Sequence, residues 1–231
     1  MKIPIDFVGD AEILAKIRES ETKNLSANFF QKIKIESYFD QSFVPKEESV
    51  KTESKSSLKI LINEIQIDSL EGPGGTDDDW VELYNPNNET IFLTGWSIQK
   101  HSKSDPCSIE TGFYKKNFPD DAQIPPKGFF LIVSTKANEN LKNIADMTIG
   151  WSLTKDNTIY LVKKQDKILG KEDPDIVDRV GFGNACWPEK NPAPDPEEGK
   201  TIERINFQDT DDNSIDFQIQ SNPSPKNSKS L

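Results

Sequence analysis

Residues 79–85 read DWVELYN, a run whose side chains alternate between the two faces of an extended chain. Val81 and Leu83 fall on one face, and Trp80 and Tyr84 fall on the other. A strand with one face against a core shows this period of two, because successive side chains point to opposite faces of a sheet. The run therefore predicts a β-strand that turns Val81 and Leu83 toward a core.

Similar runs recur after Leu58, and clusters of Pro, Gly, Asn and Asp separate them. No helical stretch of comparable length lies between them, so parallel βαβ units are not expected. The pattern predicts an all-β protein, an antiparallel β-sandwich. We expect one core that contains Val81, Leu83, Ile159, Leu161 and Val180. The predicted strands are 59–67, 79–85, 90–99, 127–134, 157–163, 175–183, 200–205 and 215–219.

The first quarter of the chain lacks this alternating sequence pattern. Residues 1–44 mix apolar and charged side chains without a clean period, so we expect a poorly ordered or partly helical extension. Residues 45–57, PKEESVKTESKSS, predict a flexible linker. The sequence as given shows no signal peptide, because acidic residues interrupt its apolar start. The residues alone leave the compartment open.

Charge limits the expected partners. The 231 residues include 28 Lys and Arg and 39 Asp and Glu, which gives a formal net charge of −11. Nucleic-acid binding draws much of its affinity from Lys and Arg that neutralise phosphates, so no nucleic-acid partner is expected. No apolar run approaches the roughly 18 residues of a spanning helix, and no membrane insertion is expected.

Several motifs occur in one order over 58–228, and together they resemble the bacterial branch of the lamin-tail domain family. The resemblance implies an immunoglobulin-like fold with no catalytic residues, so the chain is not expected to be an enzyme. The motifs are INEI (62–65), DWVELYNP (79–86), IFLTGWSIQK (91–100), IPPKGFFLIV (124–133), WSLTKDNTIYLV (151–162), IVDRVGFGNA (176–185) and the closing segment 201–228.

The family resemblance also implies a role. Its members act as interaction or display modules, and bacterial members are mostly secreted or found at the cell surface. We therefore expect a protein or other surface partner, whose identity the sequence does not give. Three alternatives stay open. The first is a calcium-stabilised adhesion domain, and the second is an appendage of an exported nuclease-type enzyme. Intracellular scaffolding is a third.

Aromatic and acidic residues supply the candidate binding sites. Trp187 lies in a Pro-rich loop and is a candidate contact anchor, whereas the other three tryptophans are expected to pack in or on the sandwich. Glu64 and Glu82 resemble an acid–base pair, but strand carboxylates more often serve as hydrogen-bond acceptors.

The acidic loop at 209–216 resembles the start of a calcium loop. Candidate ligands are Asp209, Asp211, Asn213 and Asp216, because the first three have the spacing of oxygen ligands. Gln220 replaces the Glu of an EF-hand at position twelve, which excludes that motif. The alternative is a turn that Asp and Asn side chains fix by bonding to their own backbone.

Two cysteines remain, Cys107 and Cys186, and each lies in a loop that the plain family pattern lacks. If the protein is exported, a disulfide that joins these loops is expected. Two separate reduced thiols are the alternative. A nucleophilic pair of Cys107 with His101, the only histidine, is not expected, because no third group of such a site is evident.

Overall fold

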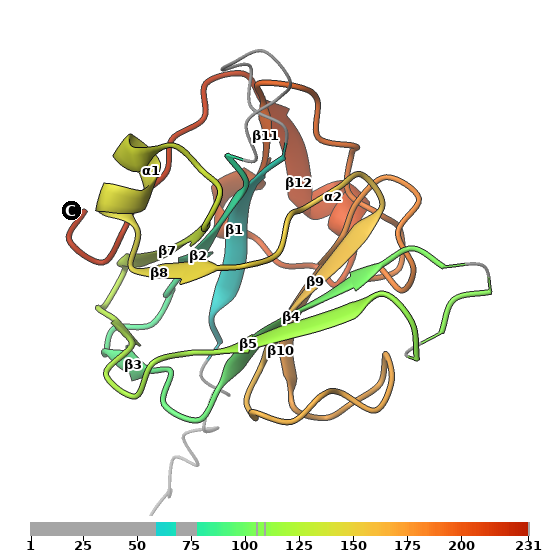
Figure 1. Ribbon diagram of the computed structural model, residues 1–231, viewed down its shortest axis with the longest axis horizontal. Coiled ribbons are helices and arrows are strands. Elements are labelled where there is room, and N and C mark those ends of the chain that lie inside the picture. The colour runs from blue at the N-terminus through green and yellow to red at the C-terminus, as the bar shows by residue number, and fades with distance from the viewer. Residues whose placement is uncertain (1–58, 68–77, 105, 109, 231) are drawn as a thin grey trace, which may run out of the picture. The chain divides into compact units, whose positions relative to one another are not determined.

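A computed structural model describes residues 59–67, 78–104, 106–108 and 110–230 (Figure 1). The predicted extension (1–44) and linker (45–57) lie outside the described residues, so both stay predictions. Within the described residues, no helix has the length and apolar character needed to cross a bilayer.

Two large sheets and one small one make up the domain, and their strands pair antiparallel except for β7 with β8. The small sheet pairs β3 (Ile91–Phe92) with β6 (Gln123–Ile124). The six-stranded sheet has the order β12 (Phe217–Gln220), β11 (Thr201–Arg204), β1 (Leu61–Gln66), β2 (Trp80–Tyr84), β7 (Phe129–Ser134) and β8 (Met147–Ile149). The four-stranded sheet has the order β10 (Ile176–Gly181), β9 (Asn157–Val162), β4 (Ser97–Ser102) and β5 (Phe113–Asn117).

The main core lies between the two large sheets. All five residues predicted to share it are buried in one apolar cluster: Val81, Leu83, Ile159, Leu161 and Val180. They come from β2, β9 and β10, so both sheets contribute. The predicted sandwich is confirmed, and the period of two identified its inner face.

The outer face of the six-stranded sheet is covered as well. Trp80 packs there with Leu131 and Val133 beneath α1 (Glu139–Ile144). At the other end of the same face, Tyr84 and Phe129 form a second cluster. Every residue of β1, β2 and β7 is therefore buried, including the polar side chains that alternate with the apolar ones in β2.

Some strand boundaries differ from the prediction. The predicted strand 90–99 is two strands, β3 and β4, because the chain turns at Gly95, where φ is +80°. A positive φ suits glycine, which has no Cβ to clash. The segment 102–126 contains β5 and β6, and the start of 215–219 belongs to α2 (Asn213–Asp216). The two-residue strands were too short to show a period.

Replacing Leu83 with alanine should lower the free energy of unfolding by about 2–4 kcal/mol. Leu83 is fully buried between the sheets, so truncation leaves a cavity that the closed sandwich fills only in part. Urea denaturation followed by tryptophan fluorescence measures the change. Leu169→Ala is the matched control, because Leu169 is 87% exposed. Equal effects of the two substitutions would contradict the assigned core.

Candidate functional site

A buried arginine connects the two large sheets. Arg204 ends β11, and its side chain is fully buried. Its Nη2 donates to both carboxylate oxygens of Asp178 in β10, at 2.8 and 3.0 Å. Its Nε donates to the carbonyl oxygen of Ile62 in β1, at 2.9 Å. Nη1 lies 3.4 Å from Asp209 and 3.5 Å from Asp216, so one cation serves three carboxylates.

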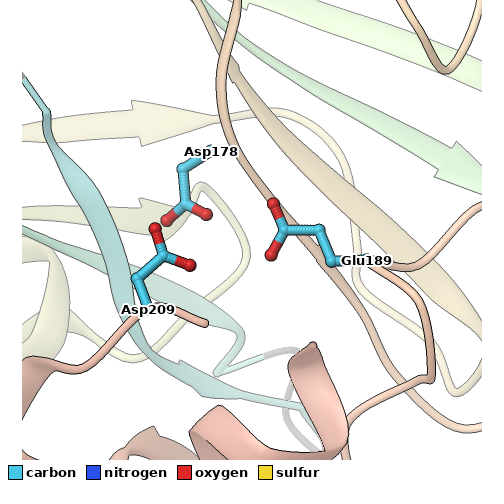
Figure 2. A group of neighbouring side chains, drawn as sticks. All are labelled: Asp178, Glu189 and Asp209. Atoms are coloured by element: carbon cyan, nitrogen blue, oxygen red, sulfur yellow. The ribbon is translucent and has the colours of Figure 1, made fainter. Parts of the chain in front are cut away.

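Three carboxylates converge beside this arginine. Figure 2 shows Asp178, Glu189 and Asp209 with their oxygens directed toward one another, and one ligand oxygen of each lies within 4.8 Å of the others. Burial, and next the charge of Asp178, raise the pKa of Glu189 to about 7. Arg204 and Arg179 act in the opposite direction, but their positive charges do not offset the burial.

This cluster has the chemistry of a hard-cation site, since calcium takes carboxylate oxygens. Protein cations already serve two of its members: Asp178 pairs with Arg204, and Asp209 pairs with both Arg204 and Lys59. A bound ion would have to share these carboxylates. The described arrangement is a structural ion-pair network.

The four predicted calcium ligands are not gathered together. Among the described residues, only Asp209 of the four belongs to a group of three or more acidic, His or Cys side chains near enough to share an ion. Asn213 accepts from the amides of Gly181 and Glu189, and Asp216 accepts from the amide and hydroxyl of Thr210.

Local hydrogen bonds hold the acidic loop, as expected for a turn that Asp and Asn side chains fix. Asp212 caps α2 by accepting from the amide of Ser214, and its second oxygen accepts from Asn191. Asp211 has a φ of 57°, in the left-handed region that Asp tolerates better than most residues. The loop therefore needs no ion to explain its shape.

Glu64 and Glu82 are neighbours on β1 and β2, on the outer face of the sheet. Both are fully buried, and each carboxylate is used as an acceptor. Glu64 accepts from Thr201, and Glu82 accepts from the side chain of Asn63 at 2.7 Å and the amide of Lys226 at 2.6 Å. Both side chains therefore serve as hydrogen-bond acceptors, the role expected to be more common for strand carboxylates than acid–base chemistry.

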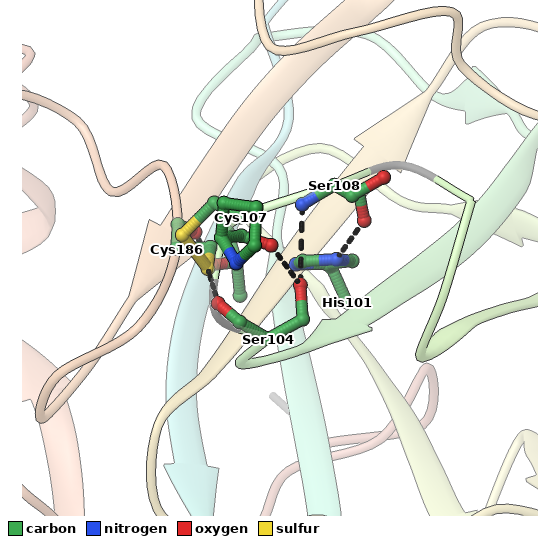
Figure 3. The surroundings of a disulfide bond; sticks show 7 residues. His101, Ser104, Cys107, Ser108 and Cys186 are labelled. Carbon is green, nitrogen blue, oxygen red and sulfur yellow. Dashed lines mark hydrogen bonds between the residues drawn. A yellow bond between two sulfur atoms is a disulfide. The ribbon is translucent and has the colours of Figure 1, made fainter.

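The two cysteine-bearing loops are joined. Figure 3 shows a disulfide between Cys107 and Cys186, whose Cα atoms are 5.7 Å apart. That separation lies in the usual range for a disulfide. Ser104 Oγ accepts from the amide of Ser108 within the first loop, and the carbonyl of Ser108 lies 2.7 Å from His101 Nε2. The loops thus form one connected structure at the end of β4.

Trp187 follows the disulfide and is half-buried. Its ring stacks on His101, with centroids 5.1 Å apart and planes 11° apart. Trp187 also packs against the cluster of Tyr160 and Val162 on the outer face of the four-stranded sheet. Its φ is 59°, which is uncommon for a bulky side chain. The role of Trp187 as a contact anchor stays a prediction.

Comparison with known proteins gives the family. A family model described as Lamin Tail Domain matches residues 53–184, which is more than half of the chain. The chain belongs to the lamin tail domain family. The match ends before Glu189, Arg204 and the acidic loop, which the structure adds to the same domain through β11 and β12.

A solved structure supports the fold of this lamin tail domain. The chain is similar to the crystal structure of a DUF4876 family protein from Bacteroides thetaiotaomicron VPI-5482, with a TM-score of 0.58 and 13% identity. The similarity covers 75% of this chain and 74% of that one. At this identity the likeness concerns the fold alone. No curated protein matches the chain.

In this lamin tail domain, sequence reasoning missed the residues that organise the site. Asp178 and Arg204 lie within the quoted motifs but were not singled out. Each is a charged residue in a short strand, and both side chains are fully buried. A buried charge in a strand requires an opposite charge, so the two positions could have been paired. Glu189 lies in a Pro-rich loop and gave no such signal.

Between pH 5 and 8, the free energy of unfolding of this lamin tail domain should fall as pH rises. Burial raises the pKa of Glu82 from 4.5 to about 7, so folding favours its protonated form. The stabilisation is full below pH 4.5 and is lost as pH passes about 7, with a limit of about 3 kcal/mol. Denaturation series at pH 5, 6, 7 and 8 measure it.

The substitution Glu82→Gln should flatten this pH dependence, because glutamine cannot ionise and keeps a similar shape. Glu203→Gln is the control, since Glu203 is half-exposed on β11 of the same sheet. The half-buried Glu189, whose pKa is also raised, contributes in the same direction and should leave a residual slope. A wild-type protein that becomes more stable from pH 5 to pH 8 would contradict the assignment.

Proposed function

We propose that this chain is a non-catalytic interaction module that acts outside the cytoplasm, at the cell surface or in secreted form. The observation that carries the proposal is the disulfide between Cys107 and Cys186. Disulfides persist in oxidising compartments and are rare in the cytosol. The lamin tail domain family is one of interaction modules, which agrees with a binding role.

The binding surface that we favour is the end of the sandwich where the two bridged loops meet. Loops on a rigid sheet scaffold carry binding functions more often than the strands do. Here the disulfide and the stacking of Trp187 on His101 limit the motion of the loops before a partner arrives. A preordered surface loses less entropy on binding, and a partly exposed indole is a frequent hot spot.

Binding to the envelope of the source cells tests this proposal. Fluorescently labelled full-length protein is titrated onto intact cells, with Trp187→Ala and Phe92→Ala as the paired variants. Phe92 is 62% exposed on β3, away from the bridged loops in sequence and sheet, so it reports on general stickiness. We expect at least a tenfold loss of affinity for Trp187→Ala and less than a twofold loss for Phe92→Ala. Absence of binding, or equal losses, would refute the proposal.

A calcium-stabilised adhesion domain is the second candidate, and the convergence of Asp178, Glu189 and Asp209 favours it. If the cluster binds calcium, 5 mM calcium should raise the melting temperature relative to EDTA by several degrees. Glu189→Gln should abolish the rise, because Glu189 is the one carboxylate of the three that forms no ion pair with Lys or Arg within the described part of the chain. A melting temperature that calcium leaves unchanged would exclude this candidate.

A further inference from the structure

The last residues of the chain form a strap across the outer face of the six-stranded sheet. We define the C-terminal strap as residues 221–230, which follow β12 and have no strand assignment. β12 is one edge of the sheet, yet Figure 1 shows the end of the chain beside α1, near the opposite edge. A bond from Asn227 to the carbonyl of Ile144, at the end of α1, agrees with this course.

A row of carboxylates lies under the strap. Glu64 on β1 pairs in register with Glu82 on β2, and Glu82 pairs with Leu131 on β7. The amide of Leu131 donates to Asp146, which places a third carboxylate at the end of the same row. Three acidic side chains therefore cross the sheet at right angles to its strands, and Glu64 and Glu82 are fully buried.

Every second residue from Ser224 to Ser228 bonds to this row. The amides of Ser224, Lys226 and Ser228 donate to Glu64, Glu82 and Asp146, at 3.2, 2.6 and 2.9 Å. The hydroxyls of both serines donate to the same carboxylates, at 3.0 and 2.6 Å. Five donors of the strap therefore bond to three acidic side chains at a regular spacing, so the row binds the backbone of an extended segment.

The prolines of the strap fit this spacing. Pro223 and Pro225 lie at the alternate positions, where no amide donor is needed. Proline fixes φ and favours an extended chain, so it prepares the segment for the row without removing a bond. The strap is therefore complementary to the sheet of its own chain. Side-chain carboxylates of the sheet accept its hydrogen bonds, in place of the backbone bonds of a strand pair.

The exposure of the strap also suits it to dissociate from the row of carboxylates. Residues 221–223, which connect it to β12, are exposed, and residues 224–228 are only half-buried. A second copy of the chain offers the same strap and the same row, so exchange between two copies replaces each bond with an identical one. We propose that the outer face of the six-stranded sheet is a self-recognition surface, on which two copies of this chain associate by exchanging their C-terminal straps.

The length of the connection decides whether a strap reaches its own row. Across the sheet, β1 with Glu64 lies two strand spacings from β12, which is about 10 Å. Along the strands, Gln220 is in register with Gln66 through Thr201, so Glu64 lies two residues, or about 7 Å, further on. The direct path is therefore about 12 Å. The four residue steps from Gln220 to Ser224 span at most about 14 Å, which is only just enough. Two steps would span about 7 Å and could not reach.

Deleting Asn222 and Pro223 from the full-length chain tests the proposal. The shortened connection prevents binding in cis but leaves the strap and the row intact, so the protein should have twice the monomer mass of 26.1 kDa by light scattering. Adding Lys226→Pro to the deletion removes the central amide donor and should return the protein to a monomer. Inserting two residues at the same place is the length control and should also give a monomer. A shortened chain that is folded and monomeric would overturn the proposal.

If the shortened chain does not fold, as judged by circular dichroism, the unmodified chain decides. It is incubated at high concentration a few degrees below its melting temperature, cooled, and separated by size. We expect a dimer fraction that Lys226→Pro abolishes and that Lys229→Pro leaves unchanged, because the Lys229 amide bonds only within the strap. No dimer, or the same dimer fraction in all three proteins, would overturn the proposal.

Discussion

Replacing Arg204 with methionine is expected to lower the free energy of unfolding by about 3–5 kcal/mol. The substitution keeps much of the side-chain volume but removes the cation between Asp178 and Asp216, whose side chains are fully buried. Both carboxylates would then lie in the interior without their partner, and Ile62 would lose the donor to its carbonyl. Chemical denaturation at pH 7 measures the loss.

Two further variants separate the charge effect from lost packing. Lys200→Met removes an ion pair with Glu197 in which both side chains are exposed. It should lower the free energy of unfolding by less than about 1 kcal/mol. The double variant Arg204→Met with Asp178→Asn should recover part of the loss, because one uncompensated charge is gone. If Arg204→Met costs no more than Lys200→Met, the buried network does not hold the domain together.

Replacing both cysteines with serine should lower the free energy of unfolding by up to about 4 kcal/mol. Cys107 and Cys186 are 79 residues apart in sequence, so the bridge removes much of the freedom of the unfolded chain. The loss should be largest at the bridged loops. Hydrogen exchange should increase at residues 102–104 and 183–187 more than in β1 or β2, which are buried on both faces.

Reduction of the unmodified protein provides the control for this prediction. Dithiothreitol should lower the melting temperature of the wild-type protein to that of the double serine variant and leave the variant unchanged. A reductant effect of equal size on both proteins would show that the difference does not come from the bridge.

The sequence predicted the sandwich because short runs rich in apolar residues are separated by clusters of Pro, Gly, Asn and Asp. Val81 and Leu83 in β2, and Ile159 and Leu161 in β9, alternate clearly, and all four lie in the one core. The outer face was harder to predict, because α1 and the C-terminal strap cover it. Glu82 alternates like a solvent-facing residue, yet it is buried by contacts with residues far away in sequence.

The candidate site could be predicted only in part. Asp209 was a candidate calcium ligand, but its partners are Arg204 in β11 and Lys59, which precedes β1, and not its neighbours in the acidic loop. Spacing along the chain predicts ligands within one loop, whereas this cluster joins β10, β11 and two loops. Glu189 reaches it from a Pro-rich segment that has no pattern of its own.

The most direct test of the proposed exported role is the state of the two cysteines in the cells that make the protein. Thiols are blocked with an alkylating reagent before lysis, and the isolated full-length chain is digested without reduction and analysed by mass spectrometry. The account predicts a linked peptide pair that contains Cys107 and Cys186 and no alkylated cysteine. Complete alkylation of both residues would contradict it, because the loops would then be reduced where the protein acts.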